Sequence, residues 1–365
     1  MPMAEGQAAP SALLPANNGD ASLNAMLAEP EPIAVHHDVD QARFEREIVP
    51  AYRPAVLRGI AGDWPAVAAA RDSDEALVDY LAAHDSGRPV TVMTAPPEVE
   101  GRYFYAPDFR GLNFRTGKQA LGPLLRCLLA ERDNPAAPGL YAGSAPAADS
   151  IAAFTADNRL PLDTRGVDPR IWVGNASRIA PHYDMSPNLA VVVAGRRRFL
   201  LFPPDQIANL YIGPVDRTVA GQPTSMVDPV HPDLDRFPRY AEAMRHALVA
   251  DLEPGDAIYI PTLWWHHVRA DAAINVLVNY WYGTLDTRFP FAALMLAMHS
   301  IRELPQPEKD AWRGWFDHYA FGEDAADAVS HLPTNAQGVL SPPSADRDRM
   351  ILDYVIGMLA TAAKR

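Results

Sequence analysis

The sequence predicts a mostly β domain with flanking helices, followed by a helical C-terminal region. Three observations lead to this prediction. The middle of the chain breaks into short apolar runs bounded by turn residues, in a protein with 35 prolines and 22 glycines, which is typical of many short strands. The segments on either side space their apolar residues as helices do. At 365 residues and 48% hydrophobic, the chain is long enough for one large domain with an appendage or for two domains.

The predicted strands lie between residues 170 and 284. Gly195 separates two of the apolar runs and Pro203-Pro204 ends the second, so we expect a compact hairpin-like unit there. The strands predicted from the runs are Ile171–Val173, Leu189–Ala194, Phe199–Phe202, Ala257–Ile260 and Ile274–Tyr282.

A mixed region precedes these strands and is expected to pack around them. The stretch between Tyr211 and Leu248, which is rich in Pro and Asp, is interpreted as an insertion over one end of the β core. The elements predicted in the mixed region are helices over Gln41–Ile48, Asp74–His84 and Gly122–Arg132 and strands over Ala55–Arg58 and Val90–Met93.

The chain therefore divides into three parts. Residues 1–30 lack a basic segment and are rich in Ala, Pro and Asn, so they are interpreted as a flexible leader and not as a signal peptide. Residues 31–285 form the β domain. Residues 286–365 form the helical region, whose last predicted helix, over Ser344–Ala363, carries one apolar stripe.

Composition excludes several classes of function. The chain has 45 acidic and 32 basic residues and a formal charge of −13, so its field repels phosphate backbones and anionic lipid, and we expect neither nucleic acid nor membrane as a partner. No apolar run approaches the ~18 to 20 residues that a membrane span requires. The single cysteine, Cys127, excludes an intramolecular disulfide and a zinc–thiolate cage, and it indicates a reducing cytoplasm.

One sequence pattern points to a metal ion. A His-x-Asp pair on a strand directs both side chains to one face, so that an imidazole and a carboxylate can share a metal. The pattern occurs at His36–Asp38, His231–Asp233 and His182–Asp184. No strand-like sequence surrounds the first, and the proline within the second cannot donate to a central ladder, so both are interpreted as surface loops. The third leads into the strongest strand signal of the chain.

A further ligand is expected from the segment Glu253–Val268, where a turn, a buried strand and two adjacent histidines follow one another. His267 shares its side of the strand with Arg269, whereas His266 shares its side with apolar residues, so His266 is predicted to point inward. Two histidines and one carboxylate on neighbouring strands form a facial triad that leaves three metal positions open. The alternative is a pair of histidines satisfied by hydrogen bonds beside two tryptophans.

Several linked motifs carry a resemblance to a known family, in order over roughly residues 30–285. They are Ala180–Asp184, Asn188, Val193–Gln206, Pro254–Pro261, Trp264–His267 and Val278–Tyr282. Together they resemble the cupin-like JmjC oxygenases, in particular those similar to the asparaginyl hydroxylase factor inhibiting HIF. The resemblance implies a double-stranded β-helix of the jelly-roll type, in agreement with the short strands read independently.

The resemblance also implies the chemistry. His182, Asp184 and His266 are the expected iron ligands, with His267 as a neighbour. Family members bind Fe(II), use 2-oxoglutarate and O2 as cosubstrates, and hydroxylate their substrate, so we expect a dioxygenase acting on a protein side chain or a small molecule. A histone demethylase ranks lower because the net charge of −13 gives it no particular support.

The resemblance assigns the cosubstrate contacts as well. Arg197 stands where the family commonly has a lysine for the distal carboxylate of 2-oxoglutarate, and arginine can hold a carboxylate bidentately. The alternative for Arg196–Arg198 is a basic turn. A threonine that the family often has before the triad is absent, and Ser177 is the nearest hydroxyl. Four further residues match cosubstrate or site-lining positions, each with core packing as the alternative: Tyr141, Asn188, Asn279 and Trp281.

Two other functions stay open from the sequence. A metal-binding cupin that senses or binds a ligand without catalysis has the same fold, although it needs no complete triad together with a carboxylate-binding arginine. The second is a scaffolding protein, a hypothesis that the C-terminal helices support. Related hydroxylases dimerise through such helices, so Ser344–Ala363 and the apolar run Phe291–Ile301 predict a homodimer. Their alternative is to fold back on their own domain.

Overall fold

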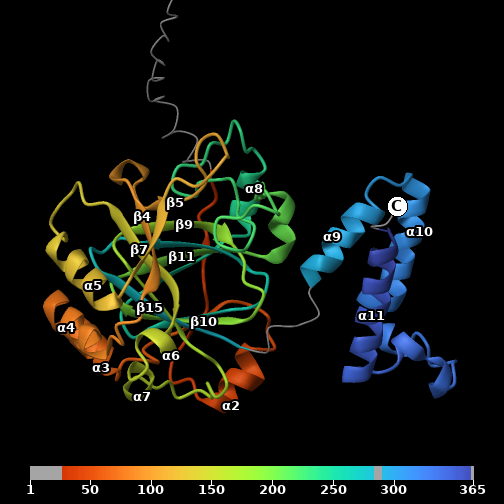
Figure 1. Cartoon of the computed structure of the whole chain (residues 1–365), viewed down its shortest axis with the longest axis horizontal. Coiled ribbons are helices and arrows are strands. Elements are labelled where there is room, and N and C mark those ends of the chain that lie inside the picture. The colour runs from red at the N-terminus through yellow and green to blue at the C-terminus, as the bar shows by residue number, and fades with distance from the viewer. Residues whose placement is uncertain (1–26, 283–289, 363–365) are drawn as a thin grey trace, which may run out of the picture. The chain divides into compact units, whose positions relative to one another are not determined.

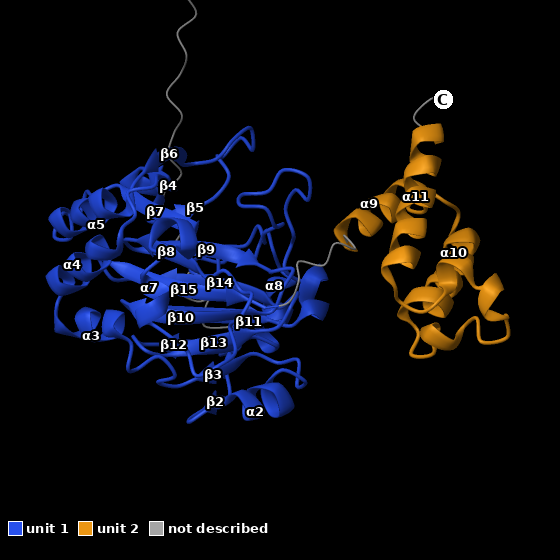
Figure 2. Cartoon of the chain, turned by 60° about the horizontal axis from the view of Figure 1, so that its bottom comes forward, with its two compact units in different colours: residues 1–285 blue, residues 286–365 orange. Residues whose placement is uncertain are grey.

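The computed structural model describes residues 27–282 and 290–362 (Figure 1). Contacts divide the chain into two compact units, Met1–Leu285 and Asp286–Arg365 (Figure 2). Unit 1 contains both β-sheets, and unit 2 is helical. Almost all of the predicted leader, residues 1–30, lies outside the described residues.

Unit 1 is built around two sheets. The smaller sheet contains β1 (Glu31–Pro32), β5 (Arg102–Tyr103), β9 (Ser177–His182), β11 (Arg197–Phe202), β12 (Leu248–Leu252) and β14 (Trp265–Ala270). The larger sheet contains β2 (Val35–His36), β3 (Ala55–Leu57), β4 (Val90–Ala95), β6 (Arg115–Gln119), β7 (Gly139–Pro146), β8 (Arg170–Gly174), β10 (Asn188–Ala194), β13 (Ala257–Ile260) and β15 (Asn275–Trp281).

The last eight strands, β8 to β15, divide equally between the two sheets, and consecutive strands lie in different sheets except for β11 and β12, which pair with each other. Four of them run in the order β12-β11-β14-β9 and four in the order β13-β10-β15-β8, and every neighbouring pair among them is antiparallel. This is the strand order of a double-stranded β-helix of the jelly-roll type. The predicted fold class, a jelly roll with flanking helices and C-terminal helices, is confirmed.

Helices cover the outer face of the larger sheet (Figure 1). Leu189 and Val191 of β10 pack in one apolar cluster with Val67 and Leu77 from these helices, whereas Ala190 and Val192 face the space between the sheets. Because both faces of β10 are buried, its sequence is a continuous apolar run. The helices of unit 1 are α2 (Gln41–Arg43), α3 (Pro65–Asp72), α4 (Asp74–His84), α5 (Leu121–Ala130), α6 (Ala147–Ser150), α7 (Phe154–Asp157) and α8 (Tyr240–Arg245).

The hairpin between β10 and β11 turns at Gly195, as the sequence predicts. Its φ of +74° lies in the left-handed region, and a Cβ built there would come within 2.1 Å of Asn275 Oδ1. Only glycine meets both conditions without strain. The turn places Arg197 at the first position of β11.

Some elements differ from the sequence prediction. The predicted helix over Gln41–Ile48 is a single α-turn that continues as a π-helix from Phe44. Strands β6 and β7 and helix α3 were outside the prediction, because β6 is almost wholly exposed and α3 is rich in alanine. Periodicity cannot reveal β6, because its residues show no alternation of exposure.

The insertion between Tyr211 and Leu248 covers the outer face of the smaller sheet. Val227 and Tyr240 from the insertion pack with Leu200, Phe202 and Trp265, which are outward-facing residues of that sheet. Unlike most connections of this length, the insertion is therefore well packed. It buries the side of β14 that faces away from the interior.

Unit 2 consists of α9 (Pro290–Ser300), α10 (Gln306–Phe316) and α11 (Ala345–Ala362) with short turns of helix between them. Among residues 290–362, Val329 is the only side chain classed as buried. In the part of the chain that the structure describes, no helix combines the length and the apolar character that a membrane crossing requires.

Candidate metal centre

Three side chains meet between the two sheets. His182 ends β9, Asp184 follows it in a turn, and His266 is the second residue of β14. One potential ligand atom from each lies within 4.8 Å of the other two. Two imidazoles and one carboxylate at one side of an ion are the donor set of non-haem Fe(II) sites, and they leave coordination positions open.

A β-bulge in β9 directs His182 inward. Val268 of β14 pairs with Ile179 of β9, and His266 pairs with His182. The two pairs are therefore two residues apart on β14 but three residues apart on β9. One extra residue of β9 is accommodated there, which reverses the alternation of the following side chains. Ile179 and His182 therefore both line the same cavity, although strict alternation would place them on opposite faces.

Backbone carbonyls fix how both histidines face the site. His182 Nδ1 lies 2.9 Å from the carbonyl oxygen of Ala180, and His266 Nδ1 lies 3.0 Å from that of Trp264. Since a carbonyl only accepts, each Nδ1 carries the proton and donates, and Nε2 is left as the metal-facing atom. Burial, followed by the neighbouring His182, lowers the pKa of His266 to about 4, so this imidazole is neutral at pH 7.

Two side chains hold the carboxylate of Asp184. Asn188 Nδ2 donates to Asp184 Oδ2 at 2.9 Å, and Trp281 Nε1 donates to the same oxygen at 3.1 Å. Oδ2 also lies 3.7 Å from His266 Nε2. The prediction placed His182 and Asp184 on one strand, but β9 ends at His182, so these hydrogen bonds orient the carboxylate where the alternation of a strand does not.

The hydrogen bond from Asn188 is the end of a longer chain. Trp172 Nε1 donates to Asn279 Oδ1 at 2.6 Å, and Asn279 Nδ2 donates to Asn188 Oδ1 at 3.2 Å. Because an indole can only donate, Trp172 fixes the orientation of the Asn279 amide. The Asn279 amide in turn fixes that of Asn188, which directs an N–H to Asp184. Both asparagines are buried, at 1% and 7% exposure for Asn279 and Asn188.

Arg197 lies in the same cavity as the three potential ligands. Its side chain is buried, and its Nε and Nη2 have no hydrogen-bond partner among the described residues. Burial lowers the pKa of the guanidinium, and Tyr141 opposes that effect. A buried cation without a carboxylate is costly, so the cavity is suited to an anionic ligand that would pair with Arg197.

The structure brings all the predicted site residues together. Tyr141, Asn188, Asn279 and Trp281 line the cavity with Arg197 and the three potential ligands. Ser177 is buried but is not among the lining residues; it is the first residue of β9, two positions before Ile179, which does line the cavity. The sequence reasoning missed Trp172, whose role depends on a neighbour more than 100 positions away.

The other histidines of the motifs lie elsewhere. His267 faces the outer side of the smaller sheet, where its Nδ1 lies 2.6 Å from the carbonyl oxygen of Ile179. His231 and Asp233 are exposed in the insertion. The prediction of a surface loop was wrong for His36, which ends the short strand β2 and is half-buried, with its Nδ1 3.3 Å from Arg43 Nη2, whereas Asp38 is exposed. Of the three copies of His-x-Asp, only the one at His182 has a second histidine beside it in a metal-binding arrangement among the described residues.

Comparison with known proteins gives one family and several distant relatives. A family model described as cupin-like domain matches residues 41–288. Human HSPB1-associated protein 1 is 35% identical over 118 residues, which are 32% of this chain and 24% of that protein. Lysine-specific demethylase JMJ31 of Arabidopsis thaliana is 32% identical over 123 residues, 33% of this chain and 22% of the demethylase.

A third relative has another activity in its name. The tRNA wybutosine-synthesizing protein 5 of Gallus gallus is 28% identical over 145 residues, which are 35% of this chain and 43% of that protein. The chain thus matches less than half the length of each of these relatives. Their names differ in the substrate they indicate, so the similarity describes a shared domain and not a shared substrate.

Proposed function

Since the chain belongs to the cupin-like domain family, we propose that it is an Fe(II)- and 2-oxoglutarate-dependent dioxygenase. The observation that carries this proposal is the pairing of two features in one cavity: a triad of potential metal ligands, and the buried Arg197, whose Nε and Nη2 have no hydrogen-bond partner among the described residues. A ligand that chelates a metal at one end and carries a carboxylate at the other suits both features. 2-Oxoglutarate is such a ligand.

The side chains around the triad would prepare it for iron. His182, Asp184 and His266 would hold the ion, and the bound Fe(II) would supply the activation of O2, coupled to the oxidative decarboxylation of 2-oxoglutarate, that oxidises the substrate. The carbonyls of Ala180 and Trp264 keep each Nδ1 protonated and each Nε2 directed at the site. Because imidazole binds a metal only when neutral, the low pKa of His266 favours loading at neutral pH.

Arg197 would orient the cosubstrate. Leu201 of β11 pairs with His266, and Arg197 lies four positions along the same strand, or about 13 Å at the usual rise of a strand. The arginine side chain and the length of 2-oxoglutarate would together span this distance. The guanidinium would pair with the distal carboxylate, and Tyr141 lines the cavity beside it. The resemblance leads one to expect a lysine at this position. Arg197 offers a longer, forked cation in its place.

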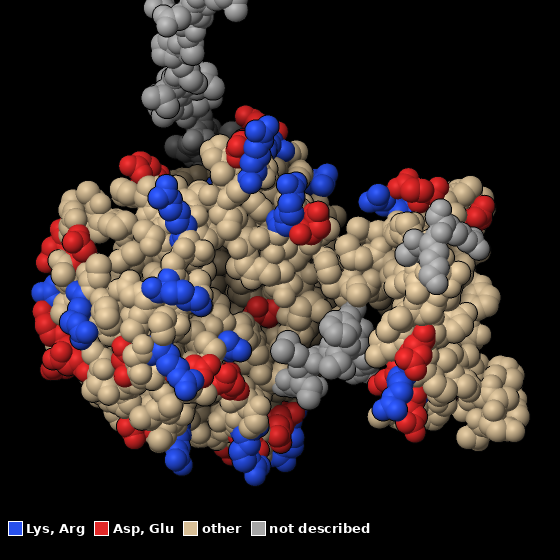
Figure 3. Space-filling view, in the orientation of Figure 1, with Lys and Arg blue, Asp and Glu red and all other residues tan. Residues whose placement is uncertain are grey.

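We propose a protein side chain as the first substrate class and a small molecule as the second. The family relatives carry names for demethylation and tRNA modification as well. On the face seen in Figure 3, basic side chains of unit 1 are scattered among acidic ones and form no continuous basic surface. This distribution and the formal charge of −13 disfavour a nucleic acid and offer a basic histone tail no more than generic attraction. The single cysteine favours a cytoplasmic location.

A reconstitution experiment tests the proposed function. The protein is loaded anaerobically with Fe(II) and 2-oxoglutarate, and the visible charge-transfer absorbance of the chelate is recorded. Admission of air should then release succinate, and a panel of peptides and metabolites should increase that release. Charge-transfer absorbance without any succinate would instead support the alternative, a metal-binding cupin that senses a ligand without catalysis.

We further propose that the protein is a homodimer built on unit 2. Among residues 290–362 only Val329 is classed as buried, while Trp315, Phe321, Tyr354 and Ile356 are each at least 60% exposed. So many exposed apolar side chains indicate an interface. A stable dimer needs a total buried area of about 1,200 Å² or more, and helices α9 to α11 offer large apolar side chains for it.

The oligomeric state tests this proposal directly. Light scattering at micromolar concentration should give the mass of a dimer for the unsubstituted protein. Replacing Val355 and Leu359 on α11 by glutamate should give a folded monomer, because burying two charges against an apolar surface is costly. A monomeric mass for the unsubstituted protein would contradict the dimer and leave the proposed metal centre unaffected.

A further inference from the structure

The bulge that directs His182 inward is held by hydrogen bonds from three sides. The carbonyl of Ile179 accepts from His267 Nδ1 at 2.6 Å. The carbonyl of Ala180 accepts from the His182 side chain at 2.9 Å, and that of Pro181 accepts from the backbone N–H of Ser225 at 2.8 Å. A bulge interrupts the ladder, so these buried acceptors need other donors. Two of the three donors come from outside β9.

One of those donors belongs to the insertion. Ser225 is fully buried, and its hydroxyl donates to the Leu210 carbonyl at 2.6 Å while accepting from Val227 N–H at 3.1 Å. This fixes a tight turn next to Pro181. The position of the N–H that reaches the bulge therefore depends on how firmly the insertion is attached to the smaller sheet.

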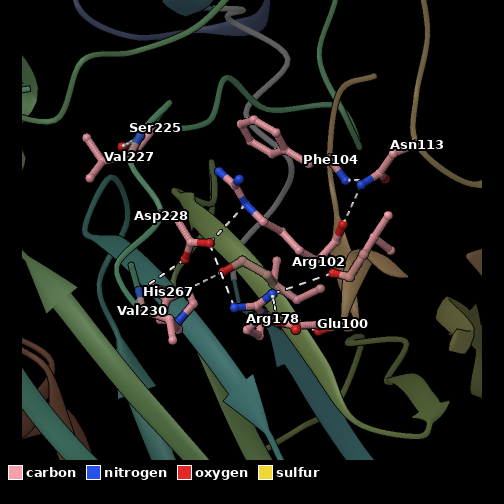
Figure 4. Close-up of polar contacts among 12 residues, drawn as sticks. Glu100, Arg102, Phe104, Asn113, Arg178, Ser225, Val227, Asp228, Val230 and His267 are labelled. Carbon is pink, nitrogen blue, oxygen red and sulfur yellow. Dashed lines mark hydrogen bonds and ion pairs between the residues drawn. The ribbon is translucent and has the colours of Figure 1, made fainter. Parts of the chain in front are cut away.

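Asp228 provides that attachment (Figure 4). Its Oδ2 lies 3.6 Å from Arg102 Nε and 3.8 Å from Arg178 Nη1, and its Oδ1 accepts from Val230 N–H at 3.0 Å. Arg102 and Arg178 are paired residues of the neighbouring strands β5 and β9. The side chains of Asp228 and Arg178 are each 14% exposed, so solvent screens this ion pair less than a surface pair.

We propose that His267 and Asp228 are positioning residues for His182. From the outer face of the sheet, His267 holds the Ile179 carbonyl, and Asp228 holds the insertion that carries Ser225. Together they keep the extra residue of β9 where it turns His182 towards the cavity. This inference rests on the proposed metal centre, because its consequence is a higher metal affinity of the triad.

The test measures metal affinity and stability separately in the full-length protein. Co(II) is added anaerobically to the apoprotein, and its dissociation constant is measured from the visible absorbance of the bound ion. The melting temperature of each apoprotein is recorded in parallel. Four variants are compared: His267→Asn, His267→Gln, Asp228→Asn and Asp251→Asn.

The two substitutions of His267 form a matched pair. Asparagine places an amide N–H near the position of Nδ1, so His267→Asn should keep the Ile179 hydrogen bond, whereas glutamine places it near Nε2. Asp251→Asn is the control for charge, because Asp251 pairs with Arg198 in the same sheet but is 67% exposed and away from the bulge. His267→Gln and Asp228→Asn should raise the dissociation constant for Co(II) about 10- to 100-fold, as loss of an outer-shell partner does. His267→Asn and Asp251→Asn should raise it by less than about 3-fold, below the range for such a loss.

Different outcomes overturn different claims. The positioning role would be overturned if all four variants bound Co(II) with dissociation constants within about 3-fold of the unsubstituted value, well short of the expected 10- to 100-fold rise. This conclusion would hold even if His267→Gln melted at a lower temperature. Absence of Co(II) binding by the unsubstituted protein would overturn the metal centre and the inference with it. Should a variant not fold, hydrogen exchange in the unsubstituted apoprotein decides: Ser225 N–H should exchange as slowly as the β14 amides, and fast exchange would contradict the inference.

Discussion

The two ends of the candidate site are built in opposite ways. At the metal end, both histidines donate Nδ1 to backbone carbonyls, and Asp184 Oδ2 accepts two hydrogen bonds. At the other end, Arg197 is buried with two nitrogens that lack partners among the described residues. The metal end is prepared by the protein itself, whereas the arginine end is completed only by a ligand. The difference separates the interactions that stabilise the apoprotein from those that we propose for the cosubstrate.

Removal of a potential metal ligand should have the largest effect. Asp184→Ala is expected to abolish Fe(II) binding and turnover, because two histidines alone cannot complete the facial triad. The protein should stay folded, since Asp184 lies in a turn with part-exposed surroundings. Metal content after dialysis and succinate release measure the loss. Turnover that survives this substitution would contradict the proposed metal centre.

The arginine end should respond differently. Arg197→Met is expected to weaken 2-oxoglutarate binding by about 2 to 5 kcal/mol, the usual cost when a buried ion pair loses one partner, with little change in Fe(II) affinity. The apoprotein should be as stable as before or more stable, because an unpaired buried charge is removed. Cosubstrate KM and chemical denaturation check both statements.

The neighbouring arginines provide the control for that experiment. Arg196 and Arg198 are exposed and pair with Glu253 and Asp251. Their replacement by methionine should leave the KM for 2-oxoglutarate unchanged. Equal effects from all three substitutions would show that the segment is a basic turn and not a carboxylate site.

Acid should act through His266 at the metal end and through His267 on the outer face of the same strand, and not through the arginine end. Burial lowers the pKa of His267 from 6.5 to about 4 and that of His266 likewise, so the unfolded chain takes up protons that the folded protein resists. The free energy of unfolding of the apoprotein therefore has its full value above about pH 6.5. It falls as the pH drops towards 4, and each of the two histidines lowers it by at most about 1.4 kcal/mol per pH unit. Urea unfolding between pH 7.5 and 4 measures the loss. A flat profile would contradict the burial of these imidazoles.

The smallest expected effect comes from the far end of the hydrogen-bond chain. Trp172→Phe keeps an aromatic ring but removes the N–H that orients Asn279, and through it Asn188 and Asp184. We expect Fe(II) affinity to fall about tenfold, at the lower limit for an outer-shell partner. Trp64→Phe, which also removes an indole donor but one bonded to Arg159 outside the site, is the matched control. Equal Fe(II) affinities in the two variants would show that the chain has no influence on the triad.

Local sequence patterns determined much of the fold. The predicted strand over Ala257–Ile260 and the predicted helix over Asp74–His84 have the observed limits, because a continuous apolar run and the helical spacing of apolar residues are both apparent within a few residues. Alternation along β14 also selected His266 over His267 for the inner face, which is where the structure places it. Gly195 as a turn residue belongs to the same group.

Alternation alone fails at the other histidine. Asp184 lies past the end of β9, and His182 reaches the cavity only because Val268 and His266 pair across a bulge. The extra residue of a bulge is defined by the partner strand, which lies more than 80 positions away in the sequence. The His-x-Asp pattern before the strongest strand signal and the resemblance to known oxygenases selected these potential ligands, and the closer likeness to an asparaginyl hydroxylase stays a prediction.

The sequence by itself determined the strand composition, the turn at Gly195, the inward position of His266 and the set of residues able to bind a metal. Tertiary structure decided how they are used: the bulge that turns His182, the hydrogen-bond chain from Trp172 to Asp184, and the burial of Arg197, two of whose nitrogens have no hydrogen-bond partner among the described residues. The physical reason is range. Backbone conformation and side-chain alternation are set within a few residues, whereas desolvation and hydrogen-bond partners are set by strands that meet only in the folded protein.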